Sequence, residues 1–385
     1  MKTTFTLLLL SIASALLSQQ TIYDTIIHDG LQRSFILYVP DTYTPTEPTP
    51  LVINFHGYTS NAFEQMNYGD FRDVADTAGF LAVHPMGTLD GSGNPYWNAN
   101  WGGDVDDIGF TAALIDSLAA DYSINTDRVF STGMSNGGFM SYTLACELSN
   151  RIAAIASVTG TMNANQTGSC SPQHPLPVME IHGTDDFVVP YNGNIFMESI
   201  PEVLSYWAGF NNCDPEPTIT EMPDLDPNDG CNAEKHFYGN GSSGVEVVHF
   251  KIINGGHTWP GTEYSTGSGN TNQDINASVE IWKFFRKFDI NGLIIPTNAE
   301  RLTHPENEIS FAPNPSPGHL MINLGSFTGG TVRITDLQGM ILHRVNANNK
   351  SKLSVNINNL PPGLYIMQFE NEMGRVVFSD KLVVI

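Results

Sequence analysis

Residues 128–138 read Arg-Val-Phe-Ser-Thr-Gly-Met-Ser-Asn-Gly-Gly, and this stretch decides the fold that we expect. Its centre, residues 133–137, fits the pattern Gly-x-Ser-x-Gly, in which a serine occupies a sharp turn between a strand and a helix. Small residues two positions before and after the serine let the neighbouring backbones pass closely. Residues 128–132 are typical of a strand and residues 138–147 of a helix, so the context predicts that Ser135 is an exposed nucleophile.

Short apolar runs alternate with helical patterns on both sides of this turn. The strand candidates are residues 34–39, 51–55, 80–83, 128–132, 155–158, 178–181 and 247–253. Between them, Phe110, Leu114 and Leu118 recur at helical spacing, and a second helical pattern begins at Ile275. Such alternation predicts an α/β fold with a mostly parallel sheet and helices on both faces.

The N-terminus has the pattern of a signal peptide. Lys2 supplies a positive charge, residues 7–17 are an apolar run, and Ser18 is a small residue before the expected cleavage. We therefore expect a signal peptide at residues 1–18, followed by the α/β domain at residues 19–297. No later run approaches the roughly 18 apolar residues that span a bilayer, so no transmembrane segment is expected.

The chain changes character after the α/β domain. Residues 298–308 are polar and lack periodicity, which is typical of a linker. Residues 309–385 then offer short alternating strands separated by turn signals such as Gly329-Gly330 and Pro361 to Gly363. This pattern predicts a small C-terminal all-β sandwich domain.

Four cysteines are candidates for disulfides, because an exported chain meets oxidising conditions. Their spacing favours Cys146 with Cys170 and Cys213 with Cys231, although three connectivities are open. The formal net charge of −23 argues against nucleic acid or an anionic membrane as a partner.

Two later segments supply partners for Ser135 in the chain order serine, acid, histidine. His182-Gly-Thr-Asp185-Asp186 follows one predicted strand, and Gly255-Gly-His257 follows another. Carboxyl ends of parallel strands meet at one edge of the sheet, where open α/β sheets place their sites. We expect His257 to be the general base and Asp186, or less directly Asp185, to orient it.

Backbone N–H groups are expected to hold the oxyanion. Asn136 follows the nucleophile, and Tyr58 follows the His56-Gly57 turn after another strand. We expect His56 and His182 to bind loop backbone, because the triad needs one base only.

No metal or other cofactor is expected. Asp104, Asp106 and Asp107 form an acidic cluster, but an acidic helix N-terminus is favoured over a metal site there. Residues 224–230 match a calcium loop imperfectly, since glycine falls at the seventh position rather than the sixth.

At these residues the chain resembles the polyhydroxybutyrate depolymerase and feruloyl/acetylxylan esterase group of α/β-hydrolases. The matching stretches are residues 106–110, 128–138, 182–186, 223–230 and 255–261. In that group the acid is the fourth residue after the histidine of His-Gly-Thr, which here is Asp186. The resemblance also implies an aromatic mouth for sugar, phenolic or polyester chains, formed by Trp259 and further by Trp97, Trp101 and Tyr191. Ordinary packing is the alternative for Trp97 and Trp101.

The tail resembles the C-terminal sorting domain of the type IX secretion system. The stretches that carry this resemblance are residues 313–315, 336–339, 360–365 and 381–385. The resemblance implies secretion or display at the cell surface, with the secretion machinery as a partner. A carbohydrate-binding β-module is the alternative, but the tail has no Trp and only Tyr365.

Together these features predict a secreted serine ester hydrolase acting through an acyl-enzyme. The expected substrates are polymeric or small esters, either polyester as in polyhydroxybutyrate depolymerases or plant-polysaccharide esters as in feruloyl and acetylxylan esterases. The alternatives are a serine peptidase of the same fold, which would cleave short peptides, and a non-catalytic glycan-binding module, which would resist fluorophosphonate labelling.

Overall fold

The computed structural model describes residues 19–264, 268–294, 309–325, 327, 329–336, 341–347, 350–370 and 376–385. The chain divides into an N-terminal unit that ends at Ile294 and a C-terminal unit that begins at Ile295. The expected signal peptide, residues 1–18, and the expected linker, residues 298–308, lie outside the described residues.

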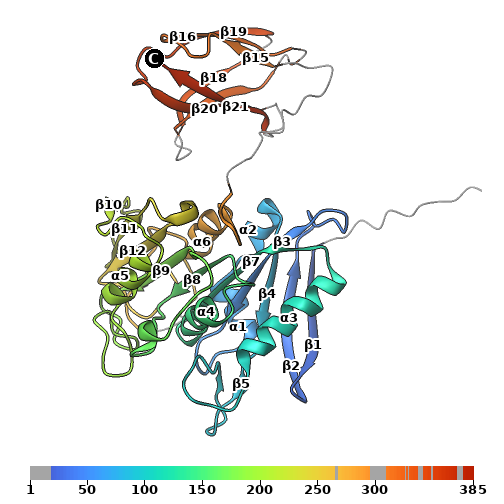
Figure 1. Cartoon of the computed structure of the whole chain (residues 1–385), viewed down its shortest axis with the longest axis vertical. Coiled ribbons are helices and arrows are strands. Elements are labelled where there is room, and N and C mark those ends of the chain that lie inside the picture. Colours follow the sequence, from blue (N-terminus) through green and yellow to red (C-terminus); the bar gives the residue numbers. More distant parts are fainter. Residues whose placement is uncertain are drawn as a thin grey trace, which may run out of the picture. The chain divides into compact units, whose positions relative to one another are not determined.

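A sheet of ten strands forms the centre of the N-terminal unit (Figure 1), in the order β1-β2-β4-β3-β7-β8-β9-β12-β11-β10. The strands of this unit are β1 (Gln20–His28), β2 (Leu31–Val39), β3 (Thr49–Phe55), β4 (Leu81–Pro85), β5 (Thr88–Leu89), β6 (Pro95–Tyr96), β7 (Ile124–Met134), β8 (Ala154–Val158), β9 (Val178–Gly183), β10 (Thr218–Glu221), β11 (Asn232–Tyr238), β12 (Val247–Ile253), β13 (Phe288–Asp289) and β14 (Gly292–Leu293). The six central strands, β4 to β12 in that order, pair in parallel, whereas the two strands at each edge pair antiparallel.

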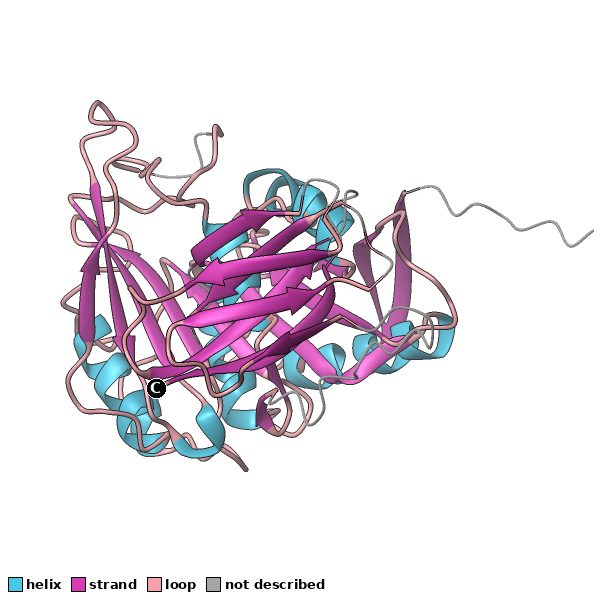
Figure 2. Cartoon of the chain, turned by 90° about the horizontal axis from the view of Figure 1, so that it is seen from above, coloured by secondary structure: helices cyan, strands magenta, loops and turns pink. Residues whose placement is uncertain are grey.

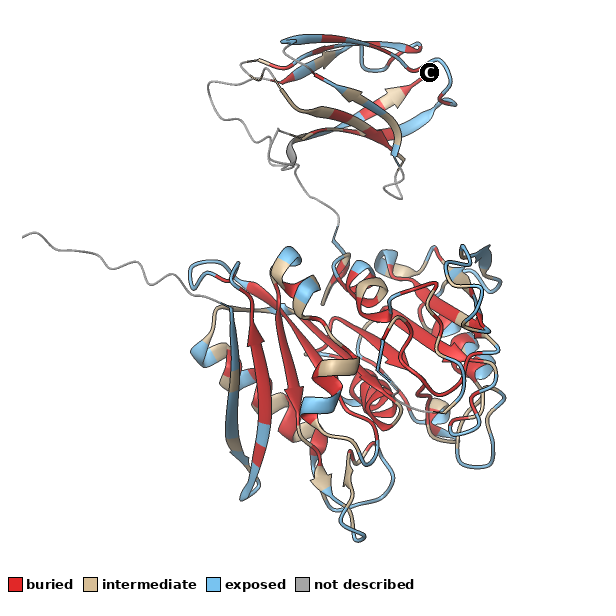
Figure 3. Ribbon diagram, turned by 180° about the vertical axis from the view of Figure 1, so that it is seen from behind, coloured by how far each residue is buried: buried red, intermediate tan, exposed pale blue. Residues whose placement is uncertain are grey.

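Helices cover both faces of this sheet. They are α1 (Ala62–Tyr68), α2 (Arg72–Ala78), α3 (Asp107–Asp121), α4 (Asn136–Glu147), α5 (Ile200–Phe210) and α6 (Ala277–Phe285), with 3₁₀ turns η1 (Gln166–Gly168) and η2 (Ser242–Gly244). One core joins α3, α4 and α5 to the sheet, and a second core joins α2 and α6 to its other face. The central strands are therefore buried on both sides (Figure 3), as apolar runs without alternation predict. The expected α/β-hydrolase fold is confirmed.

The described residues of the C-terminal unit form strands only (Figure 2). These strands are β15 (Ser310–Ala312), β16 (His319–Asn323), β17 (Thr331–Thr335), β18 (Ile341–Asn346), β19 (Lys352–Asn356), β20 (Gly363–Glu370) and β21 (Val376–Val384). They make a three-stranded and a four-stranded sheet. Leu320 and Val355 of the first sheet share one apolar core with Ile334 and Phe369 of the second, so the unit is a small β-sandwich, as expected.

One of the two expected disulfides is present. Cys146, in the last turn of α4, bonds to Cys170 beyond η1, with the two Cα atoms 4.9 Å apart. This bond fastens the C-terminal end of the helix that begins at Asn136 to the loop after β8.

The expected bond between Cys213 and Cys231 is wrong, since both residues are free thiols. Cys231 directly precedes β11, next to the end of β12, whereas the Cys213 sulfur lies 3.9 Å from the Val245 carbonyl before the start of β12. A seven-residue strand separates these places by about 20 Å, while a disulfide needs Cα atoms within about 7 Å. Sequence spacing cannot show that an intervening strand holds two cysteines at its opposite ends.

Among the described residues, no helix has the length and apolar character needed to cross a bilayer.

Three buried histidines give the N-terminal unit an acid-sensitive core. Burial lowers the pKa of His56 to about 4 and that of His84 and His249 to about 3, from an ordinary value of 6.5. Below pH 6.5 the unfolded chain binds protons at these residues and the folded chain does not. The stabilising contribution of the neutral histidines is therefore fully present above pH 6.5. As the pH decreases below 6.5, the free energy of unfolding decreases by up to about 1.4 kcal/mol per histidine for each pH unit.

His84 isolates this effect, because neither of its ring nitrogens has a hydrogen-bond partner in the described structure. We expect His84→Leu to unfold at higher denaturant concentration than the parent, with a larger advantage at pH 5 than at pH 8. Chemical denaturation of the N-terminal unit at both pH values measures this difference. An equal difference at the two pH values would contradict the account.

Candidate active site

Ser135 lies at the junction of β7 and α4 in a strained conformation. Its backbone has φ 54° and ψ −119°. Residues other than glycine rarely adopt this conformation, which costs on the order of 1–3 kcal/mol. The Ser135 N–H donates to the Val158 carbonyl of β8 at 2.8 Å, and the Ser135 carbonyl accepts from Phe139. The turn is thus anchored to the sheet on one side and to the helix on the other.

The two glycines of the pattern are required by the close passage of β3. A Cβ atom added to Gly137 would lie 2.1 Å from the Phe55 carbonyl oxygen, and one added to Gly133 would lie 2.5 Å from it. Both distances are far below van der Waals contact with a backbone atom that cannot move aside. The sequence pattern therefore reflects the packing of the turn against β3.

Asp186 and His257 meet beside this turn. Asp186 follows β9 and His257 follows β12, and a 2.7 Å hydrogen bond joins His257 Nδ1 to Asp186 Oδ2. The other carboxylate oxygen, Asp186 Oδ1, accepts from the backbone N–H groups of Val188 and Val189, each at 2.9 Å. Asp186 is buried, so its orientation is fixed by these bonds and not by solvent.

Asp185 is placed differently. Its carboxylate accepts from the neighbouring Thr184 hydroxyl at 3.2 Å in an exposed position. Of the two aspartates that the sequence offers, Asp186 therefore has the geometry of the residue that orients the histidine.

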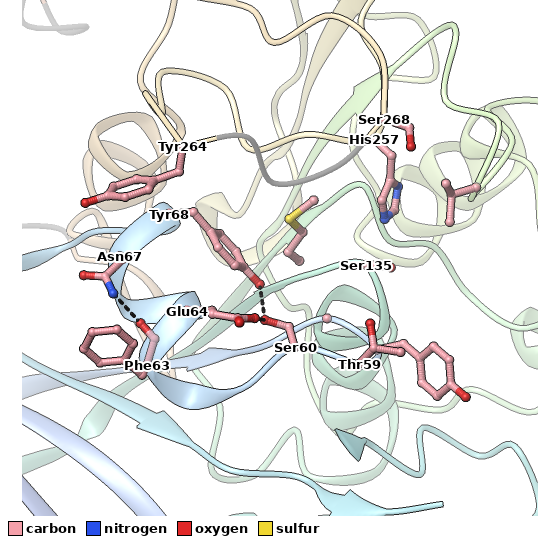
Figure 4. A pocket seen from close by; sticks show the side chains of 14 residues that line it. Thr59, Ser60, Phe63, Glu64, Asn67, Tyr68, Ser135, His257, Tyr264 and Ser268 are labelled. Carbon is pink, nitrogen blue, oxygen red and sulfur yellow. Dashed lines mark hydrogen bonds between the residues drawn. The ribbon is translucent and has the colours of Figure 1, made fainter. Parts of the chain in front are cut away.

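Ser135 and His257 line the same pocket, which has a volume of about 740 Å³. Its walls come from the segments that follow β3, β7, β9 and β12, at the carboxyl ends of these parallel strands. Figure 4 shows the His257 ring directed toward Ser135. Because Nδ1 is bonded to Asp186, Nε2 is the ring nitrogen on the side of the serine.

The peptide between Gly57 and Tyr58 is oriented by His56. The His56 Nε2 atom accepts from the Gly87 N–H at 2.9 Å, so Nδ1 carries the hydrogen and donates to the Gly57 carbonyl at 2.7 Å. In a trans peptide the Tyr58 N–H points away from that carbonyl. Gly57 packs against Ser135, as a Cβ built on it would lie 3.5 Å from the Ser135 Cβ. This places the Tyr58 N–H as an oxyanion donor candidate and gives His56 the backbone-binding role expected.

Asn136 contributes differently through its backbone and its side chain. As the first residue of α4, its N–H has no acceptor within the helix and is available to an oxyanion. Its side chain accepts from the Trp97 N–H at 2.7 Å and donates to the Trp97 carbonyl at 3.0 Å. The side chain therefore fixes the loop after β6 to the nucleophile turn.

Two of the expected aromatic substrate contacts are wrong. Trp97 is fully buried, donates its indole N–H to the His56 carbonyl and packs against Phe55. Trp259 is 1% exposed, donates to the Ser278 hydroxyl and packs on Phe71. Both indoles support the loops that carry site residues and do not reach the pocket.

The other two expected aromatics also lie outside the pocket lining. The Tyr191 hydroxyl is bonded to His249 Nε2 at 3.1 Å. Trp101 is exposed and packs on Phe139 of α4. The aromatic rings that line the pocket are instead those of Tyr58, Phe63, Tyr68 and Tyr264.

One wall of the pocket comes from α1 and was missed by the sequence analysis. The Ser60 hydroxyl donates to Glu64 at 2.7 Å and lies 3.4 Å from the Tyr68 hydroxyl (Figure 4). Burial raises the pKa of Tyr68 to about 12, so this phenol is neutral. Residues 60–68 contain no recognisable motif. Their position directly after the His56-Gly57 turn is the one sequence signal that could have indicated a place near the site.

The acidic cluster before α3 serves that helix. Asp106 caps α3 by accepting from the Gly109 N–H, and Asp107 forms a buried ion pair with Arg33. Among the described residues, one group brings three metal-ligand atoms within 4.8 Å of one another, namely His28, Asp29 and Asp106. It lies outside the pocket, on mostly exposed side chains.

The sheet order and the sharp turn between β7 and α4 give the N-terminal unit the α/β-hydrolase fold, with an acid and a histidine after later strands. Residues 44–213 match the phospholipase/carboxylesterase family, and residues 310–385 match the secretion system C-terminal sorting domain. The expected α/β-hydrolase relationship and the expected sorting domain are both confirmed.

Curated relatives are esterases by name. A bifunctional acetylxylan esterase/xylanase of Neocallimastix patriciarum is 27% identical over 71% of this chain and 36% of its own length. Feruloyl esterase B of Piromyces equi is 28% identical over 58% of this chain and 42% of its own length. The chain thus spans less than half of these two relatives, whereas it covers 97% of feruloyl esterase D of Neurospora crassa at 27% identity. Among solved structures, an acetyl xylan esterase from Aspergillus awamori aligns over 70% of this chain and 99% of its own, with TM-score 0.48 and 15% identity.

The two neighbouring aspartates allow a matched pair of variants. We expect Asp186→Asn to lower kcat by about 10⁴-fold, because the amide favours the wrong histidine tautomer. Asp185→Asn should leave kcat close to that of the parent chain. Steady-state hydrolysis of a nitrophenyl ester measures both, and the reverse order of effects would exchange the two assignments.

The role of His56 predicts a second, separable effect. We expect His56→Phe to lower kcat by about 10- to 100-fold, since the Gly57–Tyr58 peptide loses the bond that orients its oxyanion donor. His84→Leu, which removes a buried histidine of the same unit away from the pocket, serves as the control. Parent-like kcat in folded His56→Phe protein would argue against Tyr58 as a donor.

Proposed function

We propose that this chain is a secreted serine carboxylic ester hydrolase that acts through an acyl-enzyme. The observation that carries the proposal is the Asp186–His257 hydrogen bond beside a strained Ser135 in one open pocket. A serine with only a structural role in a turn would not require a buried acid and an oriented histidine at the ends of two other strands.

Acylation begins at the Ser135 hydroxyl. Its Oγ attacks the ester carbonyl carbon while His257 Nε2 takes the hydroxyl proton. Asp186 keeps the proton on Nδ1 and stabilises the imidazolium ion that forms. The tetrahedral oxyanion accepts from the backbone N–H groups of Tyr58 and Asn136, and it collapses as His257 returns the proton to the leaving alcohol.

Deacylation repeats these steps with water. His257 removes a proton from a water molecule, which attacks the acyl-enzyme carbonyl, and the same two N–H groups hold the second oxyanion. Ser135 then regains its proton and the carboxylic acid leaves. The triad and the oxyanion donors suffice for this sequence, so the mechanism uses no cofactor.

The substrates we propose are esters on plant polysaccharides or in polyesters. A pocket of about 740 Å³ is large enough for a phenolic acid or a sugar unit. Phe63 and Tyr264 offer apolar and aromatic surface at its rim, while Ser60 and Glu64 offer hydrogen-bonding groups. Acetylxylan and feruloyl esters enter the proposal because the relatives are named for them.

The C-terminal sorting domain supports secretion. We propose that the N-terminal segment acts as a signal peptide and that the sorting domain engages a type IX secretion machinery. The enzyme would then meet its polymeric substrate outside the cell, where the Cys146–Cys170 disulfide is stable.

A substrate panel tests this function directly. We expect the purified full-length chain to release product from nitrophenyl acetate and from methyl ferulate, acetylxylan or polyhydroxybutyrate film. Ser135→Ala should lose all of these activities, because no other group attacks the carbonyl. Hydrolysis that persists in Ser135→Ala, or cleavage of short peptides in place of esters, would refute the proposal.

A further inference from the structure

Two ionisable residues lie directly behind the triad and take no part in the steps above. Glu180 and His182 both belong to β9 and are completely buried. His182 Nδ1 lies 3.1 Å from Glu180 Oε1, and His182 Nε2 lies 3.4 Å from Asp186 Oδ2. The same Asp186 oxygen accepts from His257. A continuous buried chain of polar groups thus runs from Glu180 to the pocket.

The hydrogen bonds restrict where protons can be. His182 Nε2 is 2.8 Å from the Val189 carbonyl, which can only accept, so Nε2 carries a hydrogen in every state. The remaining proton is shared between His182 Nδ1 and Glu180 Oε1. The second oxygen of Glu180 accepts from the Tyr142 hydroxyl of α4 at 2.8 Å. The pair is therefore neutral as a whole, with its positive end at His182, facing Asp186.

The surroundings favour the charged form of His182. Burial acts to lower its pKa, but the hydrogen bond to Glu180 and the negative charges of Glu180 and Asp186 outweigh it, so the pKa of His182 is raised. On β12, His249 donates to the Glu180 carbonyl and is neutral, since burial lowers its pKa to about 3.

Tyr191 and Lys251 are two further titratable groups on this side of His182. The Tyr191 ring lies 6.0 Å from that of His182, and burial raises the pKa of the Tyr191 phenol, which is neutral. Lys251 of β12, the register partner of His182, has its ammonium group 5.9 Å from the centre of the Tyr191 ring. Glu180 and Asp186 are thus the charges that act on His182 at closest range.

We propose that His182, held by Glu180, is a positioning residue that sets the basicity of His257 through Asp186. This inference rests on the proposed serine hydrolase function. The His182 end of the pair lies 3.4 Å from the Asp186 oxygen that also accepts from His257, so the two histidines compete for one acceptor. A positive charge on His182 thus opposes the positive charge that His257 gains when it takes the serine proton.

His182 also stabilises the turn that holds Asp186. The bond from His182 Nε2 to the Val189 carbonyl closes the turn whose Val188 and Val189 N–H groups hold Asp186 Oδ1. His182 therefore acts on both oxygens of Asp186, on one by its charge and on the other through the loop.

The decisive variant is Glu180→Gln in the full-length chain. The amide can still accept from Tyr142 and donate to His182 Nδ1, so packing and hydrogen bonds are retained. His182 then loses the shared proton and becomes neutral. We expect the acidic limb of the kcat/KM profile to move to higher pH by about half a unit or more, because His257 retains its proton longer.

A double-variant cycle separates this role from general damage to the core. His182→Gln and the double variant Glu180→Gln/His182→Gln should move the limb about as far as Glu180→Gln alone, since each removes the positive charge on residue 182. His249→Gln is the matched control, because it removes a neutral, completely buried histidine that also bonds Glu180. We expect its acidic limb to coincide with that of the parent.

The outcomes distinguish this inference from the function on which it rests. An unmoved limb in folded Glu180→Gln protein, or an equal movement in His249→Gln, overturns the role of His182 while leaving a Ser135-dependent esterase intact. A parent chain without ester hydrolysis overturns the proposed function itself. The pH dependence of fluorophosphonate labelling supplies a second readout, which should shift in parallel with kcat/KM in Glu180→Gln.

Discussion

The left-handed turn at Ser135 is the constraint around which the N-terminal unit is arranged. It forces glycine at positions 133 and 137, because β3 passes within van der Waals distance of both. It also directs the N-terminal end of α4 at the pocket, so the first N–H groups of that helix face any charge that forms at Ser135. The disulfide at the far end of α4 and the Asn136 contacts with Trp97 hold the helix that fixes this turn.

Much of this was predictable from the sequence because the signals are local. The central parallel strands are short, apolar and buried on both faces, so they stand out without any knowledge of their neighbours. The serine turn carries its own pattern, and the acid and histidine follow strands in the order that the fold requires. The edge strands β1 and β10 were missed since their residues are largely exposed and lack a clear apolar period.

The predictions that were wrong concern features that depend on contacts between distant segments of the chain. Trp97 and Trp259 look like a substrate surface in the sequence, but their burial is decided by packing against Phe55 and Phe71, far away along the chain. Cys213 and Cys231 are near in sequence, yet β11 holds them apart. The buried pair of Glu180 and His182 was likewise invisible as a unit, because only the pleat of β9 turns both side chains to the same face.

The central claim is that Ser135 is a nucleophile activated by His257. Its most direct test is to treat the folded full-length chain with a fluorophosphonate and to locate the adduct by peptide mass spectrometry. The account predicts one adduct, on Ser135, whose formation slows by orders of magnitude in His257→Ala. Unlabelled Ser135 in protein that hydrolyses esters, or labelling that is unchanged in His257→Ala, would contradict it.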